Sequence, residues 1–390
     1  MAIFVIPFIG WFSKLVDRHK KQTVLYILFT IYALICLIFA LLLSHPVIGV
    51  ANTQPSPYRI FGWLFSLTMD FYPTFVIGTF WAFINSISTP DFAKNSYGII
   101  HAFVKMGSIF ATSVCVYLTY RATESVTLIP LLVAFAGLLT LTSLIFISKI
   151  IKSVPAEHLV GYQGAKKQAI ELTKKPVWGI FEGIKHMITK PYVFGIFFII
   201  YCYDVIFTIV EYQAHVMLSA KTANIANRMN LYLFSSATIS QVIGLFIAVL
   251  VTSRVLNKTK TKFSLLIMPI SSVILVIMIF LFPCLATMLT AMTLLPAIHF
   301  SLNSPVREIL FIPTIKDIQF KSKAWMDSFG RTLSKSSAST INMLFTPQSN
   351  IFILFSSSFS FVLVAAWSVV AYAMGNKYEK TVDKGDIIGG

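Results

Sequence analysis

The chain has 390 residues, of which 56% are hydrophobic and only 12% are charged, whereas about 25% of the residues of a soluble globular protein are usually charged. So much apolar surface does not fit inside a soluble domain of this length, so it is expected to face lipid, and the composition excludes a soluble enzyme. The net charge of +16 would otherwise suggest nucleic acid as a partner, but no nucleic-acid-binding motif is present, and the four cysteines (Cys36, Cys115, Cys202 and Cys284) have no metal-ligand spacing.

Apolar runs along the chain predict membrane-spanning helices, each of which needs about 20 apolar residues. The short first run covers residues 1–13, and full-length runs follow at 23–43, 61–85, 98–119, 127–149, 194–217, 231–252, 263–282, 285–304, 324–345 and 351–374. The run at 324–345 is the most polar, because it carries charges and several serines. We expect an all-α polytopic membrane protein in which 1–13 is part of a membrane helix and the chain begins after a first helix.

The basic residues follow these spans, since every second loop is rich in Lys and Arg. The basic loops are 14–22, 149–190, 253–262, 305–323 and 375–390, and the loop at 86–97 on the same side holds only Lys94. The loops between them hold only Arg59, Arg121, Lys221 and Arg228. Cytoplasmic loops collect Lys and Arg. The pattern therefore predicts a multi-pass membrane protein with a cytoplasmic C-terminus and a positive charge that reflects topology more than partner binding. We expect the protein in the cell inner (plasma) membrane.

One long hydrophilic stretch divides the spans into two groups. With one further N-terminal helix, the arrangement becomes six plus six, which is similar to major-facilitator-type transporters. We expect an incomplete N-terminal transmembrane half at 1–149, a cytoplasmic central loop at 150–192, a C-terminal transmembrane half at 193–376 and a cytoplasmic tail at 377–390. Within the central loop, 176–192 is typical of an amphipathic helix on the membrane surface.

A related pattern occurs in both halves. Residues 10–21, GWFSKLVDRHKK, contain a glycine, an Asp-Arg pair and a basic end, which resembles the loop between the second and third helices of major facilitators. The corresponding place in the second half holds TSRVLNKTK at 252–260. This recurrence favours two related halves.

The most specific motif is PVREILFIPTIKDIQFKSKAWMDSFGRTLSKS at 305–336. It resembles the signature of the ATP/ADP translocase family, the nucleotide transporters of obligate intracellular bacteria and plant plastids. Shorter similarities are FWAFIN at 80–85 and Val210-Glu211. The resemblance implies nucleotide exchange, and its signature positions are Arg307, Glu308, Lys316, Lys321, Lys323, Trp325 and Asp327.

The chain departs from this family at four places. A functional lysine belongs to the family's first helix, which precedes this chain. His215 follows Ala214 where the family has Trp-Lys, and His299 stands where the nucleotide exchangers carry a lysine. Asp70 lies near the position of a family glutamate. Fewer fixed positive charges are therefore available for phosphate groups.

Charged residues inside spans are functional candidates, because a charge at mid-bilayer costs at least about 2.5 kcal/mol. Arg331 and Lys335 lie one helical turn apart on one face, where they would bind an anion such as phosphate, and the family resemblance falls on Lys335. The alternative is that they pair with carboxylates and brace the bundle. Glu211 would pair with Lys335 in the empty state, or would lie at the lip of its helix and face water.

Further candidates are distributed over other spans. Asp204 lies two turns before Glu211 on the same face. Lys105, one turn after His101, would supply positive charge, or would be a lysine whose ammonium snorkels to the membrane surface. Asp327 is expected at the start of a polar helix, and Trp325 as an interface anchor or, alternatively, a base-stacking platform.

No phosphate-binding P-loop, catalytic triad, metal cluster or paired carboxylates appear in the sequence, so we expect no enzyme activity and no cofactor. The leading interpretation is a secondary transporter that exchanges ATP/ADP-type nucleotides by alternating access. One alternative is a proton-coupled or exchange transporter of another small anionic metabolite, in which titration of His215 or His299 makes uptake pH-dependent. The other is a truncated, non-transporting remnant.

Overall fold

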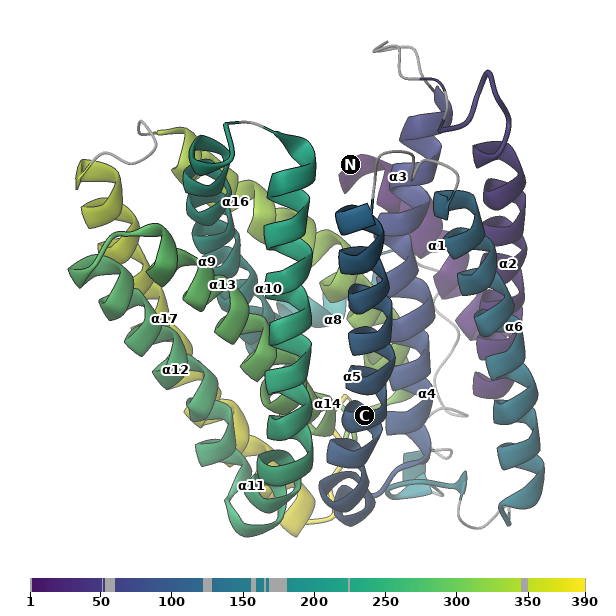
Figure 1. Ribbon diagram of the computed structural model, residues 1–390. Helices are drawn as coiled ribbons and strands as arrows, with labels where there is room; N and C mark the ends of the chain where they lie inside the picture. Colours follow the sequence, from purple (N-terminus) through teal and green to yellow (C-terminus); the bar gives the residue numbers. More distant parts are fainter. Residues whose placement is uncertain are drawn as a thin grey trace. The chain divides into compact units, whose positions relative to one another are not determined.

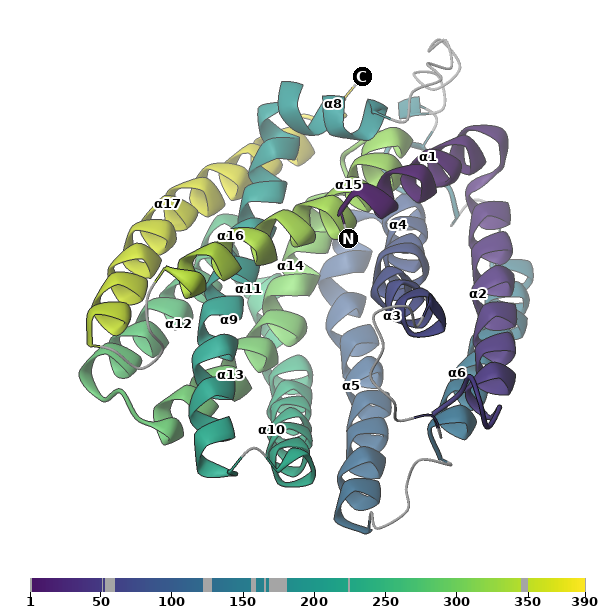
Figure 2. The same cartoon turned by 90° about the horizontal axis from the view of Figure 1, so that it is seen from above.

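A computed structural model describes residues 2–50, 52, 60–121, 128–155, 159–164, 166–167, 181–223, 225–344 and 350–389 (Figures 1 and 2). Within these ranges the chain is almost entirely helical. Nine helices of the described chain are long and apolar enough to cross a membrane. The prediction of an all-α polytopic membrane protein is therefore confirmed.

Internal contacts divide the chain into two compact units that do not follow the order of the sequence. Unit 1 consists of residues 1–88, 121–185 and 316–328, and unit 2 consists of residues 89–120, 186–315 and 329–390. The predicted transmembrane halves concern topology in a membrane and stay a prediction. The 305–336 motif contributes to both units, because its central part belongs to unit 1 and its two ends belong to unit 2.

Unit 1 is built on two long helices that lie side by side, α2 and α6 (Figures 1 and 2). Gly137 of α6 lets the helices approach, since a Cβ there would lie 3.0 Å from the Ala33 carbonyl oxygen and 3.1 Å from the Cys36 Cβ. The elements of unit 1 are α1 (Ala2–Arg18), α2 (Lys21–Leu43), α3 (Ile60–Tyr72), η1 (Pro73–Ile77), α4 (Gly78–Ile87), α6 (Leu128–Ser153), η6 (Ile318–Ser322) and α15 (Lys323–Trp325).

The elements α3, η1 and α4 form one continuous helix with a π-helical segment that begins at Pro73. Proline lacks the backbone N–H that an α-helix needs at an interior position, so the hydrogen-bond pattern changes at this residue. Two short elements, α8 (Glu182–Thr189) and η7 (Met326–Gly330), each contribute residues to both units.

Unit 2 contains the remaining helices, of which α12 and α17 lie side by side along their length (Figures 1 and 2). Its elements are α5 (Pro90–Arg121), α9 (Pro191–Lys221), α10 (Ala226–Phe246), η4 (Ile247–Thr252), α11 (Ser253–Lys258), α12 (Thr261–Leu281), α13 (Leu285–Ile298), η5 (His299–Asn303), α14 (Ser304–Ile309), α16 (Arg331–Met343) and α17 (Asn350–Asp383).

All nine helices that meet the length and hydropathy requirements coincide with predicted spans. The two predicted runs outside this set are also helical. Residues 2–13 of the first run belong to α1, which has 17 residues, and residues 324–343 of the polar run lie in the helical segment that ends with α16, which is too polar to qualify.

Two helix ends differ from the prediction. The described part of the expected 176–192 helix is α8, which ends at Thr189, because Pro191 begins a new helix, α9; residues 176–180 lie outside the described ranges. The last helix, α17, continues to Asp383, so the first residues of the predicted tail are helical. Beyond it, Ile388 exchanges backbone hydrogen bonds with Pro313 and Ile315.

Candidate functional site

The contact between α9 and α16 sets the geometry of the charged residues in unit 2. A cluster of buried apolar side chains fixes the two helices against each other, and it consists of Val205, Ile209, Ala338 and Ile341. This packing brings the Arg331 guanidinium Nε to 4.0 Å from the Asp204 carboxylate Oδ2. Both side chains are partly buried, since that of Arg331 is 34% exposed and that of Asp204 is 16% exposed. These two residues form the charged layer of unit 2, next to the apolar cluster.

Lys335 lies one turn beyond Arg331 on α16 and is exposed. Glu211 is half-buried on α9, and within the described chain no ion pair joins it to Lys335. Their pairing in the empty state of the transporter stays a prediction. The carboxylate that approaches this helix face is Asp204, and its partner is Arg331.

His299 is packed against an aromatic ring. Its imidazole stacks on the Tyr203 ring with the centroids 3.4 Å apart and the planes 13° from parallel. The Asn303 Nδ2 lies 3.2 Å from the His299 Nδ1. Because an amide nitrogen donates, Nδ1 accepts, and a neutral imidazole then carries its proton on Nε2. His215 lies on the same helix as Tyr203 and is half-buried.

Lys105 lies at the middle of α5 and is only 2% exposed. Its ammonium Nζ donates to the Gln241 Oε1 at 2.7 Å and lies 5.2 Å from the centroid of the Phe300 ring. Halfway along a helix of 32 residues, it is roughly 22 Å from either end at about 1.5 Å per residue. The interpretation of Lys105 as a snorkelling lysine is therefore wrong, since its ammonium is held inside unit 2.

The Arg-Glu pair of the signature lies in α14 and is buried in unit 2. Arg307 is 4% exposed and Glu308 is 1% exposed, and their nearest side-chain atoms, Nη2 and Oε1, are 3.6 Å apart. The chain turns directly after α14, where the Tyr192 hydroxyl donates to the Leu310 carbonyl oxygen at 2.8 Å. This part of the signature is thus anchored to the start of α9.

The signature lysines of unit 1 have structural partners. The Lys321 Nζ lies 2.5 Å from Asp17 Oδ1, 2.5 Å from Glu182 Oε2 and 3.3 Å from Asp317 Oδ1. Burial by itself lowers the pKa of Lys321, but the carboxylates of Asp317, Asp17 and Glu182 outweigh it and hold this pKa above the ordinary lysine value. Lys321 is therefore a charged, fully paired ammonium in the core of unit 1.

Lys316 makes a second contact between the 305–336 motif and the 10–21 segment. Its Nζ donates to the carbonyl oxygens of Val16 at 2.7 Å and His19 at 3.2 Å. Cations stabilise helix C-termini by bonding the last carbonyl groups. Lys316 therefore closes the end of α1, next to Asp17.

Two signature residues that follow, Lys323 and Trp325, are also buried in unit 1, and the third, Asp327, is half-buried. Lys323 is 3% exposed and Trp325 is 1% exposed, and the Trp325 ring centroid lies 6.1 Å from that of Phe181. An interface anchor or a stacking platform needs an accessible ring, so burial contradicts both interpretations of Trp325. Asp327 does not begin its helix, because the helical segment already includes η6 and α15; its carbonyl oxygen accepts from the Thr74 hydroxyl at 3.1 Å.

The structure groups most of the predicted substrate-binding residues in unit 2 and leaves one elsewhere. The residues in unit 2 are Lys105, Asp204, Glu211, His215, His299, Arg331 and Lys335. Asp70 is exposed on α3 in unit 1. Sequence reasoning did not identify Tyr203, Gln241 and Asn303 as candidates. Each carries a polar group in the middle of a span, and because such a group is unfavourable in a bilayer, its position indicates a functional or packing role.

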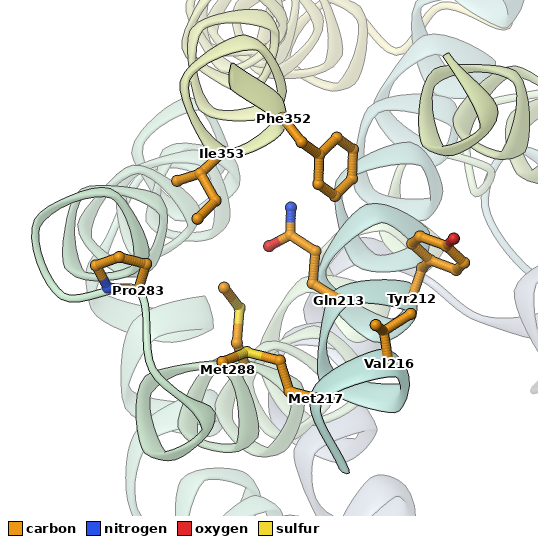
Figure 3. Close-up of a pocket in the computed structure, with 8 residues that line it drawn as sticks. All are labelled: Tyr212, Gln213, Val216, Met217, Pro283, Met288, Phe352 and Ile353. Atoms are coloured by element: carbon orange, nitrogen blue, oxygen red, sulfur yellow. The ribbon is translucent and has the colours of Figure 1, made fainter. Parts of the chain in front are cut away.

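A small apolar cavity of about 60 Å³ lies in unit 2 between α9, α13 and α17 (Figure 3). Its wall includes Met217, Met288, Phe352 and the side chain of Gln213, which donates to the Ser356 hydroxyl at 3.1 Å. None of the predicted substrate-binding residues lines it. With little polar lining and the volume of about two water molecules, it is a packing cavity and not the candidate site.

The helices and the charged layer of unit 2 define a multi-pass membrane protein with ionisable groups inside its bundle. No protein-family model matches the chain. It is similar to ADP,ATP carrier protein 3 of Rickettsia bellii (strain RML369-C), with 25% identity over 406 aligned residues that cover 88% of this chain and 77% of the carrier. The similarity is distant and extends over most of both chains, and it supports the relationship that the 305–336 motif indicates.

Proposed function

We propose that this protein is a secondary transporter that exchanges ATP/ADP-type nucleotides across the cell inner membrane, with its C-terminus in the cytoplasm. Three observations support the proposal: the apolar helices, the charged layer of unit 2, and the similarity to a carrier whose name states ADP and ATP. In this proposal the two sequence halves form a major-facilitator-like six-plus-six bundle and rock about a central site by alternating access.

The observation that carries the proposal is the arrangement of Arg331 and Lys335. Arg331 is held beside Asp204, while Lys335, one turn further, is exposed and forms no ion pair within the described ranges. A lysine that is accessible and not neutralised, next to an oriented guanidinium, is suited to a phosphate group. The further residues of the proposed substrate site are Glu211, Lys105, Asp70, His215, His299 and Asp204, the last as the ion-pair partner of Arg331.

Uptake by proteoliposomes tests the proposal. Liposomes that contain the purified full chain and are preloaded with ADP should take up labelled ATP, and excess unlabelled ADP should compete. Lys335→Ala should abolish most of this uptake, whereas Lys258→Ala, at the exposed end of α11, should not. Correctly inserted wild-type protein that ignores all nucleotides would refute nucleotide exchange and favour a different cargo or the non-transporting remnant.

A second candidate is a proton-coupled or exchange transporter of another small anionic metabolite. The observation that favours it is that histidines, His215 and His299, occupy the positions of family lysines. Uptake of an anion into empty liposomes, driven by an imposed pH gradient without any internal exchange substrate, would support this candidate over nucleotide exchange.

A further inference from the structure

The most unusual charge in unit 2 is the ammonium of Lys105, which is buried and has no carboxylate partner among the described residues. Lys105 is 2% exposed, and within the described chain its polar contacts are a neutral amide, Gln241, and the face of Phe300. A buried ammonium usually pairs with a carboxylate, because the cost of removing it from water otherwise stays uncompensated. The protein thus maintains an unneutralised positive charge at the middle of α5.

The surroundings of Lys105 are built for its side chain. Gly244, one turn after Gln241 on α10, leaves room for the lysine stem, since a Cβ there would lie 3.0 Å from the Lys105 Cε and 3.3 Å from its Cδ. A larger residue at this position would require the Lys105 and Ser301 side chains to shift. Gln241, with an oxygen that accepts but carries no charge, then fixes the ammonium at 2.7 Å.

A second donor group lies at the same place. The Ser301 hydroxyl is fully buried, has no hydrogen-bond partner in the described part of the chain, and would lie 2.6 Å from the same Gly244 Cβ. An unpaired buried hydroxyl is unfavourable, so this group is available to a ligand that accepts its hydrogen bond.

We propose that Lys105 and Ser301 bind a phosphate group of the transported substrate, and that Gln241 is the positioning residue that holds the Lys105 ammonium without neutralising it. The proposal rests on the proposed function for the identity of the substrate. Phosphate is the chemistry that an ammonium and a hydroxyl donor both recognise. Lys105, Gln241 and Phe300 all lie well inside their spans, which favours a transported anion over a lipid headgroup.

Charge-specific variants test this role. Gln241→Glu has nearly the same shape but neutralises the ammonium, and Lys105→Gln keeps a hydrogen bond while it removes the charge. The double variant Lys105→Gln/Gln241→Lys exchanges the partners and restores the charge. The matched control is Gln213→Glu, which places a carboxylate at another buried glutamine of unit 2, next to Ser356 instead of a lysine.

The measurement is binding of labelled ADP, pyrophosphate and adenosine to the purified full chain in phosphatidylcholine nanodiscs. We expect Gln241→Glu and Lys105→Gln each to raise the Kd for ADP and pyrophosphate by at least about tenfold. The exchanged double variant should recover part of this loss, and Gln213→Glu should bind like the wild type. The thermal unfolding midpoint of Gln241→Glu should not fall, because the new carboxylate pairs with the ammonium.

The outcomes separate this inference from the proposed function. Kd values within about twofold of the wild type in both single variants, with nucleotide exchange intact, would overturn the phosphate site and leave the transporter. Pyrophosphate binding that depends on Lys105, in a protein that binds and exchanges no nucleotide, would support the anion site and refute nucleotide transport. A wild-type protein that binds neither ADP nor pyrophosphate would overturn both.

Discussion

The ammonium of Lys321 lies 2.5 Å from the Asp17 carboxylate, although the two residues come from opposite ends of the chain. Each belongs to a motif that the sequence analysis singled out, the 10–21 segment, whose Asp-Arg pair ends α1, and the 305–336 signature. Glu182 and Asp317 complete the group around the ammonium. In unit 1 these motifs therefore contribute to the stability of the fold through one buried lysine.

Replacement of Lys321 by methionine should destabilise the protein strongly. The change keeps the length of the side chain but removes the ammonium that lies among three carboxylates, and loss of one partner of a buried pair costs about 3–5 kcal/mol. The thermal unfolding midpoint of the purified protein measures the effect. Lys14→Met, at an exposed position of α1, is the control and should change the midpoint little; an equal, small effect of both variants would contradict the structural role.

The same group predicts how stability depends on pH. The pKa of Lys321 is raised in the folded state, so its contribution is fully present below the unfolded lysine pKa of about 10.4 and is lost only as the pH rises through the folded value. The midpoint difference between wild type and Lys321→Met should therefore stay constant between about pH 7 and pH 9. A difference that shrinks across this window would show that Lys321 is not held as a paired ammonium.

Arg331 and Asp204 should affect transport more than stability. They are 4.0 Å apart and partly exposed, and pairs of this kind contribute about 0–1 kcal/mol. Asp204→Asn removes the competing carboxylate, so the KM for ADP should fall while the unfolding midpoint changes little. Arg331→Gln should raise that KM. If both variants lower stability and leave KM unchanged, the pair braces the bundle instead of binding the substrate.

Much of the fold follows from composition along the chain. A run of about 20 apolar residues has few alternatives to a membrane helix, and the predicted 263–282 span, for example, corresponds to α12 from Thr261 to Leu281. Helix boundaries were less accurate where proline changes the hydrogen bonding. Pro191 starts a new helix inside the region that was expected to be one amphipathic segment.

The roles of individual charges were harder to predict, because they depend on which helices meet. Lys321 and Lys335 both lie in the 305–336 motif, yet Lys321 is buried among three carboxylates and Lys335 is exposed. The hydrogen-bond partner of Lys105 could not be predicted from the sequence either. A helix that is apolar around its whole circumference gives no periodicity from which its rotation follows, so the contact of Lys105 with Gln241 on α10 has no signature in the sequence.

Gly375 should be essential for the packing of α17 against α12. A Cβ at this position would collide with the backbone Cα and N of Lys262, which cannot move as a side chain can. Gly375→Ala should therefore cost about 1–3 kcal/mol. Gly62 is the matched control, since a Cβ there meets nothing within 4 Å, and Gly62→Ala should stabilise the helix by about 0.5–1 kcal/mol. Unfolding midpoints that shift in the same direction for both variants would contradict the close approach.

The C-terminal segment should hold the turn that follows the Arg-Glu pair. The Ile388 N–H donates to the Pro313 carbonyl oxygen at 2.7 Å, and the Ile315 N–H donates to the Ile388 carbonyl oxygen at 3.2 Å. Ile388→Pro removes the first donor, at a cost of about 1 kcal/mol, and should release both contacts. Hydrogen exchange of the Ile315 amide reports this directly and should become faster. Ile387→Pro is the adjacent control, since no backbone bond to this turn uses the Ile387 N–H; equal exchange rates in the two variants would show that the segment does not secure the turn.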